Sequence, residues 1–165
     1  MILLIAYGNE LRQDDGAGLR LAELMARRWQ AVSTPLRHLT VQQLTPELAL
    51  EIADPGVTAV VFVDTRAVAP GDEATGAAEA VTVTPLAAPD ASSPSLGHHF
   101  QPDVLLAYAA LFLENQPAPP AWLATVPGVA FDHGEGLSPI ASAAIEAAFD
   151  DETQPLPRLM ARLAE

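Results

Sequence analysis

Short apolar runs alternate along this chain with longer amphipathic stretches, and this alternation predicts its secondary structure. Residues 2–6, 57–63 and 122–126 are almost continuously apolar, which is typical of strands covered on both faces of a sheet. Residues 37–41 and 80–84 are less apolar and predict two further strands, the first of them near an edge of the sheet. The pattern therefore indicates a sheet of about five strands.

Helices are expected between these strands, where apolar residues recur at the helical period. Thr45 is expected to cap a helix that has Pro46 at its first position and ends at Ile52. Ser138, which also precedes a proline, is expected to cap the last long helix in the same way. The expected helices cover residues 18–29, 46–52, 102–112 and 139–149, and residues 150–165 form a tail or a short terminal helix.

Strands that alternate with helices along a chain place it in the α/β class. We expect a three-layer α/β/α arrangement, in which helices cover both faces of a mostly parallel, twisted sheet. The sequence contains no internal repeat and no shift in composition that would mark a boundary. Residues 1–165 are therefore expected to form a single domain.

The charge and composition of the chain exclude several classes of partner and chemistry. Eight basic residues against 21 acidic ones give a net charge of −13, which argues against nucleic acid or an anionic membrane as partner. The chain has no cysteine, so disulfides, thiolate nucleophiles and thiolate metal sites are excluded. The first apolar run is short and lacks a basic flank, which indicates a core strand and, by default, a cytoplasmic protein.

Polar residues that carry chemistry follow the predicted strands. Asp14 and Asp15 come after the first strand, and Asp64 directly follows the apolar run 57–63. His98 and His99 lie at the end of a Pro- and Ser-rich loop. Because ligands bind beyond the carboxyl ends of the strands in open α/β sheets, these residues are expected to converge. Two carboxylates and an imidazole suit a borderline divalent ion such as nickel or zinc.

Each of these residues also has a purely structural interpretation. Asp14 and Asp15 are acidic groups before a helix, where either one favours the helix N-terminus. Asp14 is also placed to orient Asp15. Asp64 is alternatively a turn residue, and the two histidines are alternatively helix-capping or solvated groups.

Other enzyme and nucleotide motifs are absent from the sequence. Ser138 stands in the wrong position of its glycine-rich segment for a G-x-S-x-G nucleophile elbow, and no H-E-x-x-H segment occurs. Leu21 occupies the place of the third glycine of a dinucleotide-binding fingerprint. A P-loop is excluded because the chain contains no lysine. Nucleotide binding is therefore not expected.

The order of these motifs resembles the nickel–iron hydrogenase maturation proteases. Asp64, at the end of its apolar strand, is similar to a second landmark of that family. The segment 97–102 is similar to a third landmark, and the segment 131–139 is similar to the loop and final helix that end the family's pattern. The first landmark is the pattern G-N-x-L-x-x-D-D-G-x-G, formed here by Gly8, Asn9, Leu11, Asp14, Asp15, Gly16 and Gly18.

The resemblance implies a function as well as a fold. Members of this family remove a C-terminal extension from the hydrogenase large subunit after nickel has been inserted. It implies that Asp15, Asp64 and His98 are the catalytic and metal-contacting residues, with nickel supplied by the substrate precursor. His99 is an alternative to His98, although the spacing to Pro102 favours His98. A non-catalytic docking relative and a stand-alone metallohydrolase are the competing interpretations.

Overall fold

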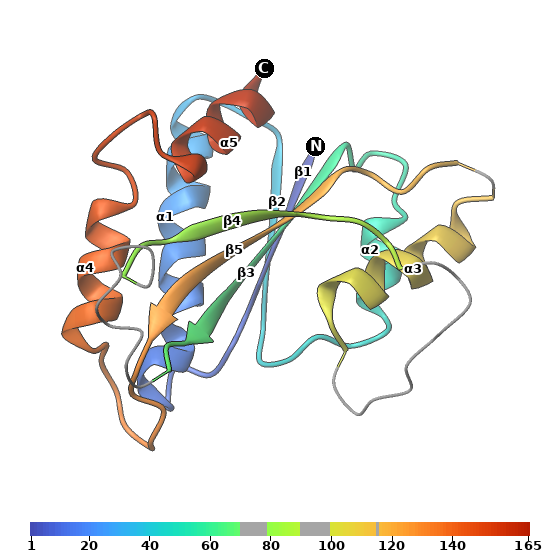
Figure 1. Cartoon of the computed structure of the whole chain (residues 1–165). Coiled ribbons are helices and arrows are strands. Elements are labelled where there is room, and N and C mark those ends of the chain that lie inside the picture. Colours follow the sequence, from blue (N-terminus) through green and yellow to red (C-terminus); the bar gives the residue numbers. More distant parts are fainter. Residues whose placement is uncertain (70–78, 90–99, 115) are drawn as a thin grey trace.

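The computed structural model describes residues 1–69, 79–89, 100–114 and 116–165. Within these residues, five strands form one sheet in the order β2-β1-β3-β5-β4 (Figure 1). Neighbouring strands are parallel except β4, which runs antiparallel to β5 at one edge. The less apolar strand β2 forms the other edge, as the sequence predicts. The strands are β1 (Ile2–Tyr7), β2 (Leu36–Val41), β3 (Ala59–Ala67), β4 (Thr82–Leu86) and β5 (Ala121–Gly128).

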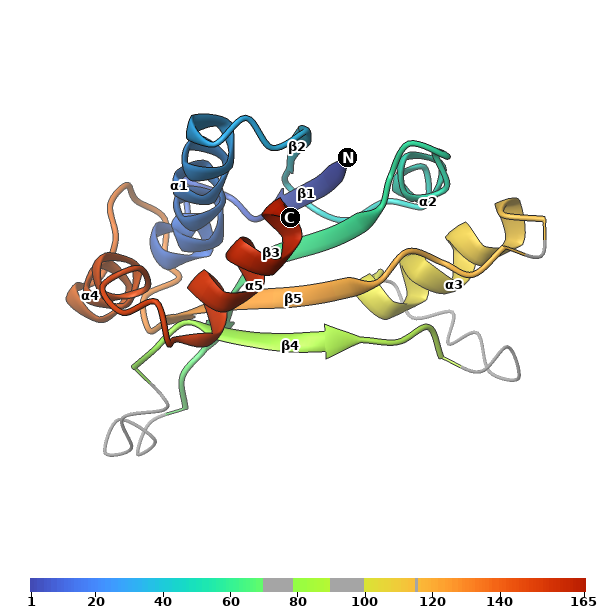
Figure 2. The ribbon, with the colours of Figure 1, turned by 90° about the horizontal axis from the view of Figure 1, so that it is seen from above.

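Helices cover both faces of this sheet, so the predicted three-layer α/β/α class is confirmed (Figure 2). A single 3₁₀ turn, η1 (Gln13–Gly16), precedes the first long helix. One layer contains α1 (Ala17–Ala31), α4 (Pro139–Ala147) and α5 (Pro155–Ala164), and the opposite layer contains α2 (Leu48–Ile52) and α3 (Pro102–Phe112).

The alternation of side chains along the strands creates two cores, one on each face. In β1, Leu4 and Ala6 pack towards α1, whereas Leu3 and Ile5 pack towards α2 and α3. All four side chains are fully buried. Burial of a large apolar side chain contributes about 1.5–3 kcal/mol, so two-sided burial explains why β1 is apolar at nearly every position.

Strand β3 differs from the prediction at its carboxyl end. The sequence predicts a strand that stops before Asp64, but β3 continues to Ala67. The pairing of β3 with β1 stops at Val63, while its pairing with β5 continues to Ala67 opposite Gly128. Asp64 is therefore the first residue of β3 that projects beyond β1, and the longer neighbour β5 extends the strand.

Other element bounds are confirmed in part. Helix α3 has the predicted bounds, and Ser138 caps α4 by accepting a hydrogen bond from the Ala141 N–H (3.3 Å). The prediction that Thr45 caps the next helix is wrong, because i→i−3 hydrogen bonds make a tight turn and α2 begins only at Leu48. Strand β4 lies two residues later than predicted, and residues 155–164 form the terminal helix α5.

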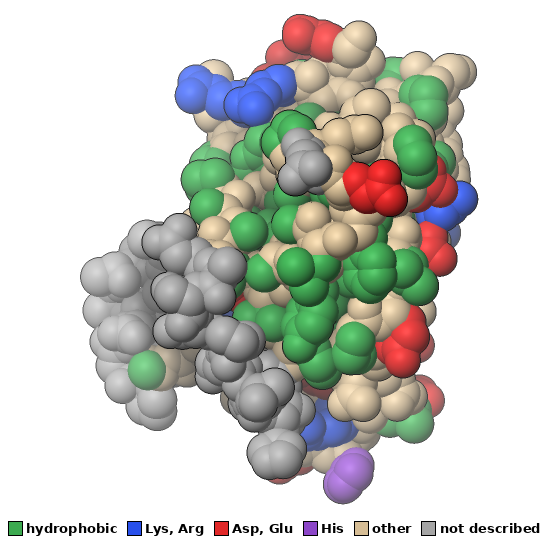
Figure 3. Space-filling model, turned by 90° about the vertical axis from the view of Figure 1, so that its right-hand side faces the viewer, with side chains coloured by type: hydrophobic (Ala, Val, Ile, Leu, Met, Phe, Trp, Pro, Cys, Tyr) green, Lys and Arg blue, Asp and Glu red, His purple; other side chains and the backbone are tan. Residues whose placement is uncertain are grey.

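Large hydrophobic side chains remain exposed on the layer that contains α2 and α3. Hydrophobic side chains gather on this side of the molecule (Figure 3). Leu50 of α2 and Leu111 and Phe112 of α3 are each more than half exposed. These two helices are short, and no helix of the described residues has the length and apolarity needed to cross a membrane.

Gly18 allows α1 to lie directly against β3. A Cβ at this position would lie 2.8 Å from the carbonyl carbon of Asp64 and 2.9 Å from its Cα. Alanine favours a helix by up to about 1 kcal/mol over glycine, but overpacking against a backbone costs about 1–3 kcal/mol. We therefore expect Gly18→Ala to lower the free energy of unfolding by about 1–2 kcal/mol in urea denaturation.

Gly56→Ala is the matched control for this substitution. A Cβ at Gly56 would meet only one side-chain oxygen of Asp54, at 3.1 Å. This partly exposed side chain can shift more readily than backbone, although it accepts a hydrogen bond from the Gly56 N–H. A Gly18→Ala protein as stable as the Gly56→Ala protein would contradict the close packing of α1 on β3.

Candidate active site

The sheet has a topological switch point between β1 and β3. The chain leaves β1 through α1 to reach β2 on one side, and then returns through α2 to β3 on the other side of β1. Ligands of open α/β sheets bind outside the carboxyl ends of the strands at such a point. A cleft of about 510 Å³ lies there, lined by Tyr7, Gly8, Asp15, residues 42–46, Asp64, Thr65, Phe100 and Gln101.

Asp64 is placed in this cleft by the alternation of β3. Its side chain follows that of Phe62 by two positions and therefore projects from the same face of the sheet. The Oδ1 atom of Asp64 accepts a hydrogen bond from the Thr65 N–H at 2.7 Å. Tyr7 follows the last register pair of β1 and β3, so its side chain lies beside Asp64 on the same face.

The ionisation of Asp64 is displaced towards neutral pH. Burial raises the pKa of Asp64 to about 6, and the negative charge of Asp15 adds to the increase. Hydrogen bonding to the Thr65 N–H and the Tyr7 hydroxyl works in the opposite direction. Burial and the charge of Asp64 also raise the pKa of Tyr7, so its hydroxyl remains a neutral donor. A carboxylate with such a raised pKa in a cleft is a candidate functional group.

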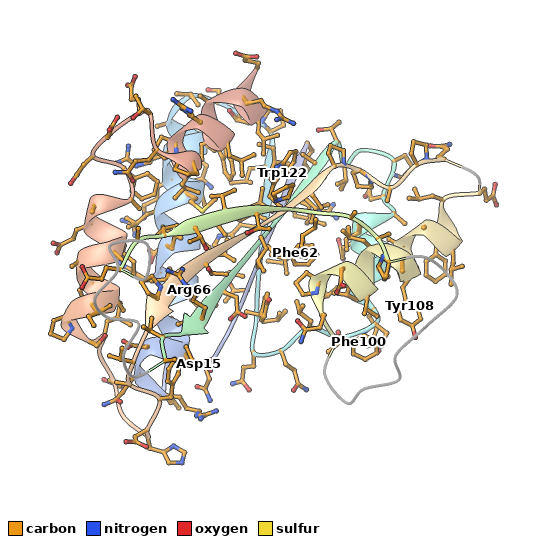
Figure 4. The ribbon with its side chains drawn as sticks, viewed as in Figure 1. Asp15, Phe62, Arg66, Phe100, Tyr108 and Trp122 are labelled. Carbon is orange, nitrogen blue, oxygen red and sulfur yellow. The ribbon has the colours of Figure 1, made fainter. Side chains whose placement is uncertain are left out.

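Asp15 reaches the same cleft from η1, below the carboxyl end of β3 (Figure 4). Its Oδ2 accepts a hydrogen bond from the Asn9 N–H at 2.8 Å. Gly8 has φ +148°, and a Cβ there would lie 2.1 Å from the carbonyl oxygen of Asp15. The Gly8-Asn9 turn therefore holds Asp15 closely, and a side chain at Gly8 is incompatible with this arrangement.

Asp14 has a different role from Asp15, and its interpretation as a cap of the following helix is wrong. Its carboxylate points away from the cleft and is fully buried. Oδ2 accepts hydrogen bonds from the N–H groups of Val129 and Ala130, and Oδ1 accepts one from the N–H of Ser138, at 2.7–3.0 Å. These hydrogen bonds lower the pKa of Asp14 despite the opposing effect of its burial. Asp14 thus anchors η1 to the loop that leads into α4.

Of the three residues expected to contact a metal, Asp15 and Asp64 line one cleft. His98 and its alternative His99 lie outside the described residues. Within the described parts of the chain, no group of three His, Cys, Asp or Glu side chains is placed to hold a metal ion. The oxygen donors of Asp15 and Asp64 suit a divalent ion that brings further ligands of its own.

Tyr7 and Arg66 are polar residues near the site that the sequence does not single out. The sequence signal that identifies Tyr7 is the alternation along β1, because Tyr7, like Leu3 and Ile5, projects towards the layer of α2 and α3. Arg66 is visible beside the end of β3 in Figure 4 and donates hydrogen bonds to the Thr125 carbonyl (3.0 Å) and hydroxyl (2.9 Å). It joins β3 to β5 and is not among the cleft residues.

Several solved structures that share the fold of this chain are hydrogenase maturation proteases. The chain aligns with the hydrogenase maturating endopeptidase HybD from E. coli at 21% identity and a TM-score of 0.57, over 98% of this chain and 91% of that one. It aligns with the NiFe hydrogenase maturation protease HybD from Thermococcus kodakarensis at 19% identity and a TM-score of 0.55, over 99% of both chains.

A third solved structure, the hydrogenase 2 maturation peptidase from a Thaumarchaeota archaeon, aligns at 18% identity with a TM-score of 0.56, over 98% of this chain and 97% of that one. No protein-family model and no curated protein sequence matches the chain. The fold of this chain is the fold of the hydrogenase maturation proteases, and the resemblance predicted from the sequence is confirmed at that level.

Proposed function

We propose that this chain is an endopeptidase that removes the C-terminal extension of a nickel–iron hydrogenase large-subunit precursor after nickel insertion. The observation that supports this proposal most directly is the convergence of Asp15 and Asp64 in the switch-point cleft. The fold shared with hydrogenase maturation proteases supports the same substrate class. We expect the protein to act in the cytoplasm, without a nucleic-acid or membrane partner.

In this proposal the nickel ion belongs to the substrate and is recognised by the cleft. Asp15 and Asp64 supply carboxylate oxygens to the ion, and His98 supplies an imidazole nitrogen, with His99 as the alternative. A divalent ion polarises a carbonyl group or lowers the pKa of bound water, which removes the need for a protein nucleophile. Cleavage then depends on nickel loading.

The surroundings of Asp64 suit this role. The Thr65 N–H holds one oxygen of the carboxylate, and Tyr7 hydrogen-bonds to the same group. Such partners orient a metal-contacting carboxylate. Because the pKa of Asp64 is about 6, a substantial fraction of the group is ionised at neutral pH, which metal contact requires.

The test is cleavage of a purified large-subunit precursor by the purified chain, followed by intact-mass measurement. We expect a shortened product from the nickel-loaded precursor and none from the nickel-free precursor. His98→Ala is expected to slow processing by at least about tenfold, as expected for loss of a metal contact, whereas the adjacent substitution His99→Ala serves as its matched control.

Three outcomes would contradict parts of this proposal. Stable binding of the nickel-loaded precursor without a shortened product would indicate a non-catalytic docking protein. Tight stoichiometric metal in the purified chain, together with cleavage of nickel-free precursor, would indicate a metallohydrolase with its own ion. Loss of activity in His99→Ala but not in His98→Ala would exchange the roles of the two histidines.

A further inference from the structure

The switch-point cleft continues past Asp15 into a second depression. This depression has a volume of about 570 Å³ and borders the first along Asp15, Gln42, Gln43 and Thr45. On its far side it is lined by Asn9, Arg12 and Val41. The two depressions therefore form one furrow that crosses the carboxyl ends of β1 and β2, with Asp15 at the boundary between them.

Arg12 supplies a positive charge to this furrow. Its Nη2 donates a hydrogen bond to the Phe131 carbonyl oxygen at 3.2 Å, and its backbone N–H donates to the Asn9 carbonyl at 3.0 Å. Arg12 also pairs with Gly134 in an isolated β-bridge. The loop 129–138 thus holds both the backbone of Arg12 and one side of its guanidinium group, while the residue remains exposed to solvent.

The guanidinium group of Arg12 has no carboxylate partner within 4.0 Å among the described residues. By contrast, Arg20 and Arg27 both pair with Glu23, and Arg37 pairs with Glu51. In a chain with 21 acidic and eight basic residues, an arginine that lines a furrow without an acidic partner is available to a ligand.

We propose that the depression beside Arg12 is a peptide subsite that binds an acidic side chain of the substrate, close to the bond that is cut. This inference rests on the proposed function. An extended peptide advances about 3.3 Å per residue, so a segment held at Asp15 and Asp64 places nearby residues in the neighbouring depression. A guanidinium fork binds a carboxylate with two parallel hydrogen bonds.

The charge of the rest of the molecule makes this subsite selective. A net charge of −13 repels an acidic peptide from most of the surface. A single positive group in the furrow therefore favours one placement of the peptide and disfavours a shift along the furrow. At the other end of the furrow, the described lining residues Leu44, Pro46, Phe100 and Gln101 are uncharged and offer an acidic side chain no positive partner.

The test compares wild type, Arg12→Met, Arg12→Glu and Arg12→Lys in the cleavage of a nickel-loaded large-subunit precursor at low ionic strength. Arg12→Met is expected to raise KM about two- to fivefold, and Arg12→Glu about tenfold, with kcat within about twofold of wild type. Arg12→Lys keeps the charge and is expected to retain most of the affinity. Arg158→Met, on the exposed surface of α5, removes the same charge outside the furrow and is the matched control.

Charge exchange locates the acidic side chain in the substrate. Each acidic residue near the cleavage site is replaced by lysine, and one of these precursors is expected to be processed with a lower KM by Arg12→Glu than by wild type. Equal KM values for Arg12→Glu and Arg158→Met, or a decrease confined to kcat, would contradict the proposed acidic subsite but not the proposed peptidase function. Absence of cleavage by wild type would instead remove the proposed function, and this inference with it.

Discussion

Asp64→Asn is expected to cleave a nickel-loaded precursor at least about a thousandfold more slowly than wild type. The same variant is expected to have a higher free energy of unfolding than wild type at pH 7. The rate falls because the variant loses a charged contact to the ion, and such contacts contribute several kcal/mol to the transition state. Single-turnover cleavage followed by mass spectrometry measures this effect. Asp15→Asn is expected to lose cleavage in the same way, because both carboxylates line the cleft.

The gain in stability follows from the raised pKa of Asp64. Its folded-state pKa of about 6 lies above the ordinary value of 3.8, so the folded protein favours the protonated group. The contribution of this group to stability is complete below pH 3.8 and is lost as the pH rises through about 6. An asparagine stays neutral, so the variant is expected to gain about 2–3 kcal/mol at pH 7 and almost nothing at pH 4.

Urea denaturation at the two pH values measures the gain in stability. Asp150→Asn, which alters an exposed carboxylate after α4, is the matched control and is expected to change neither cleavage nor stability at pH 7. If Asp64→Asn cleaved the precursor at the wild-type rate, this result would contradict a catalytic role for Asp64. A variant that is less stable than wild type at pH 7 would show that the ionised carboxylate supports the fold.

Asp14→Ala is expected to lower the free energy of unfolding by about 3–5 kcal/mol. The substitution removes a buried charged acceptor and leaves the N–H groups of Val129, Ala130 and Ser138 without this partner. Hydrogen bonds to charged groups contribute about 1.5–3 kcal/mol each, and partial access of water to the loop reduces the total. The free energy of unfolding of Asp14→Asn is expected to lie between those of wild type and Asp14→Ala, because an amide retains one acceptor oxygen.

The effect of Asp14 on stability has the opposite pH dependence to that of Asp64. Its pKa is lowered, so its contribution is present above the ordinary value of 3.8 and is lost as the pH falls below it. The difference between wild type and Asp14→Ala is therefore expected to narrow in acid, as measured by urea denaturation. Asp132→Ala, an exposed carboxylate of the late loop, is the control. An equal loss in Asp132→Ala would contradict the anchoring role of Asp14.

Local sequence signals determined those elements whose ends depend on neighbouring residues. Pro102 at the start of α3 and the hydroxyl cap of Ser138 at α4 act within one turn of helix, and both helices begin where the sequence predicts. Apolar runs with two-sided burial likewise identified β1 and the first part of β3, residues 59–63. Adjacent carboxylates after a strand pointed to the cleft, because parallel strands end at one edge of a sheet.

The family resemblance pointed to Asp15, but only the tertiary structure shows why Asp15 and not Asp14 faces the cleft. Asp14 and Asp15 are chemically identical, and the difference between them arises from the loop 129–138, more than 100 residues away, which binds Asp14 through its N–H groups. The length of β3 beyond Asp64 depends equally on its partner β5. Such long-range hydrogen bonds leave no signature in the local sequence. Burial does leave one, because side chains alternate regularly along a strand or helix, and capping does, because it acts within one turn.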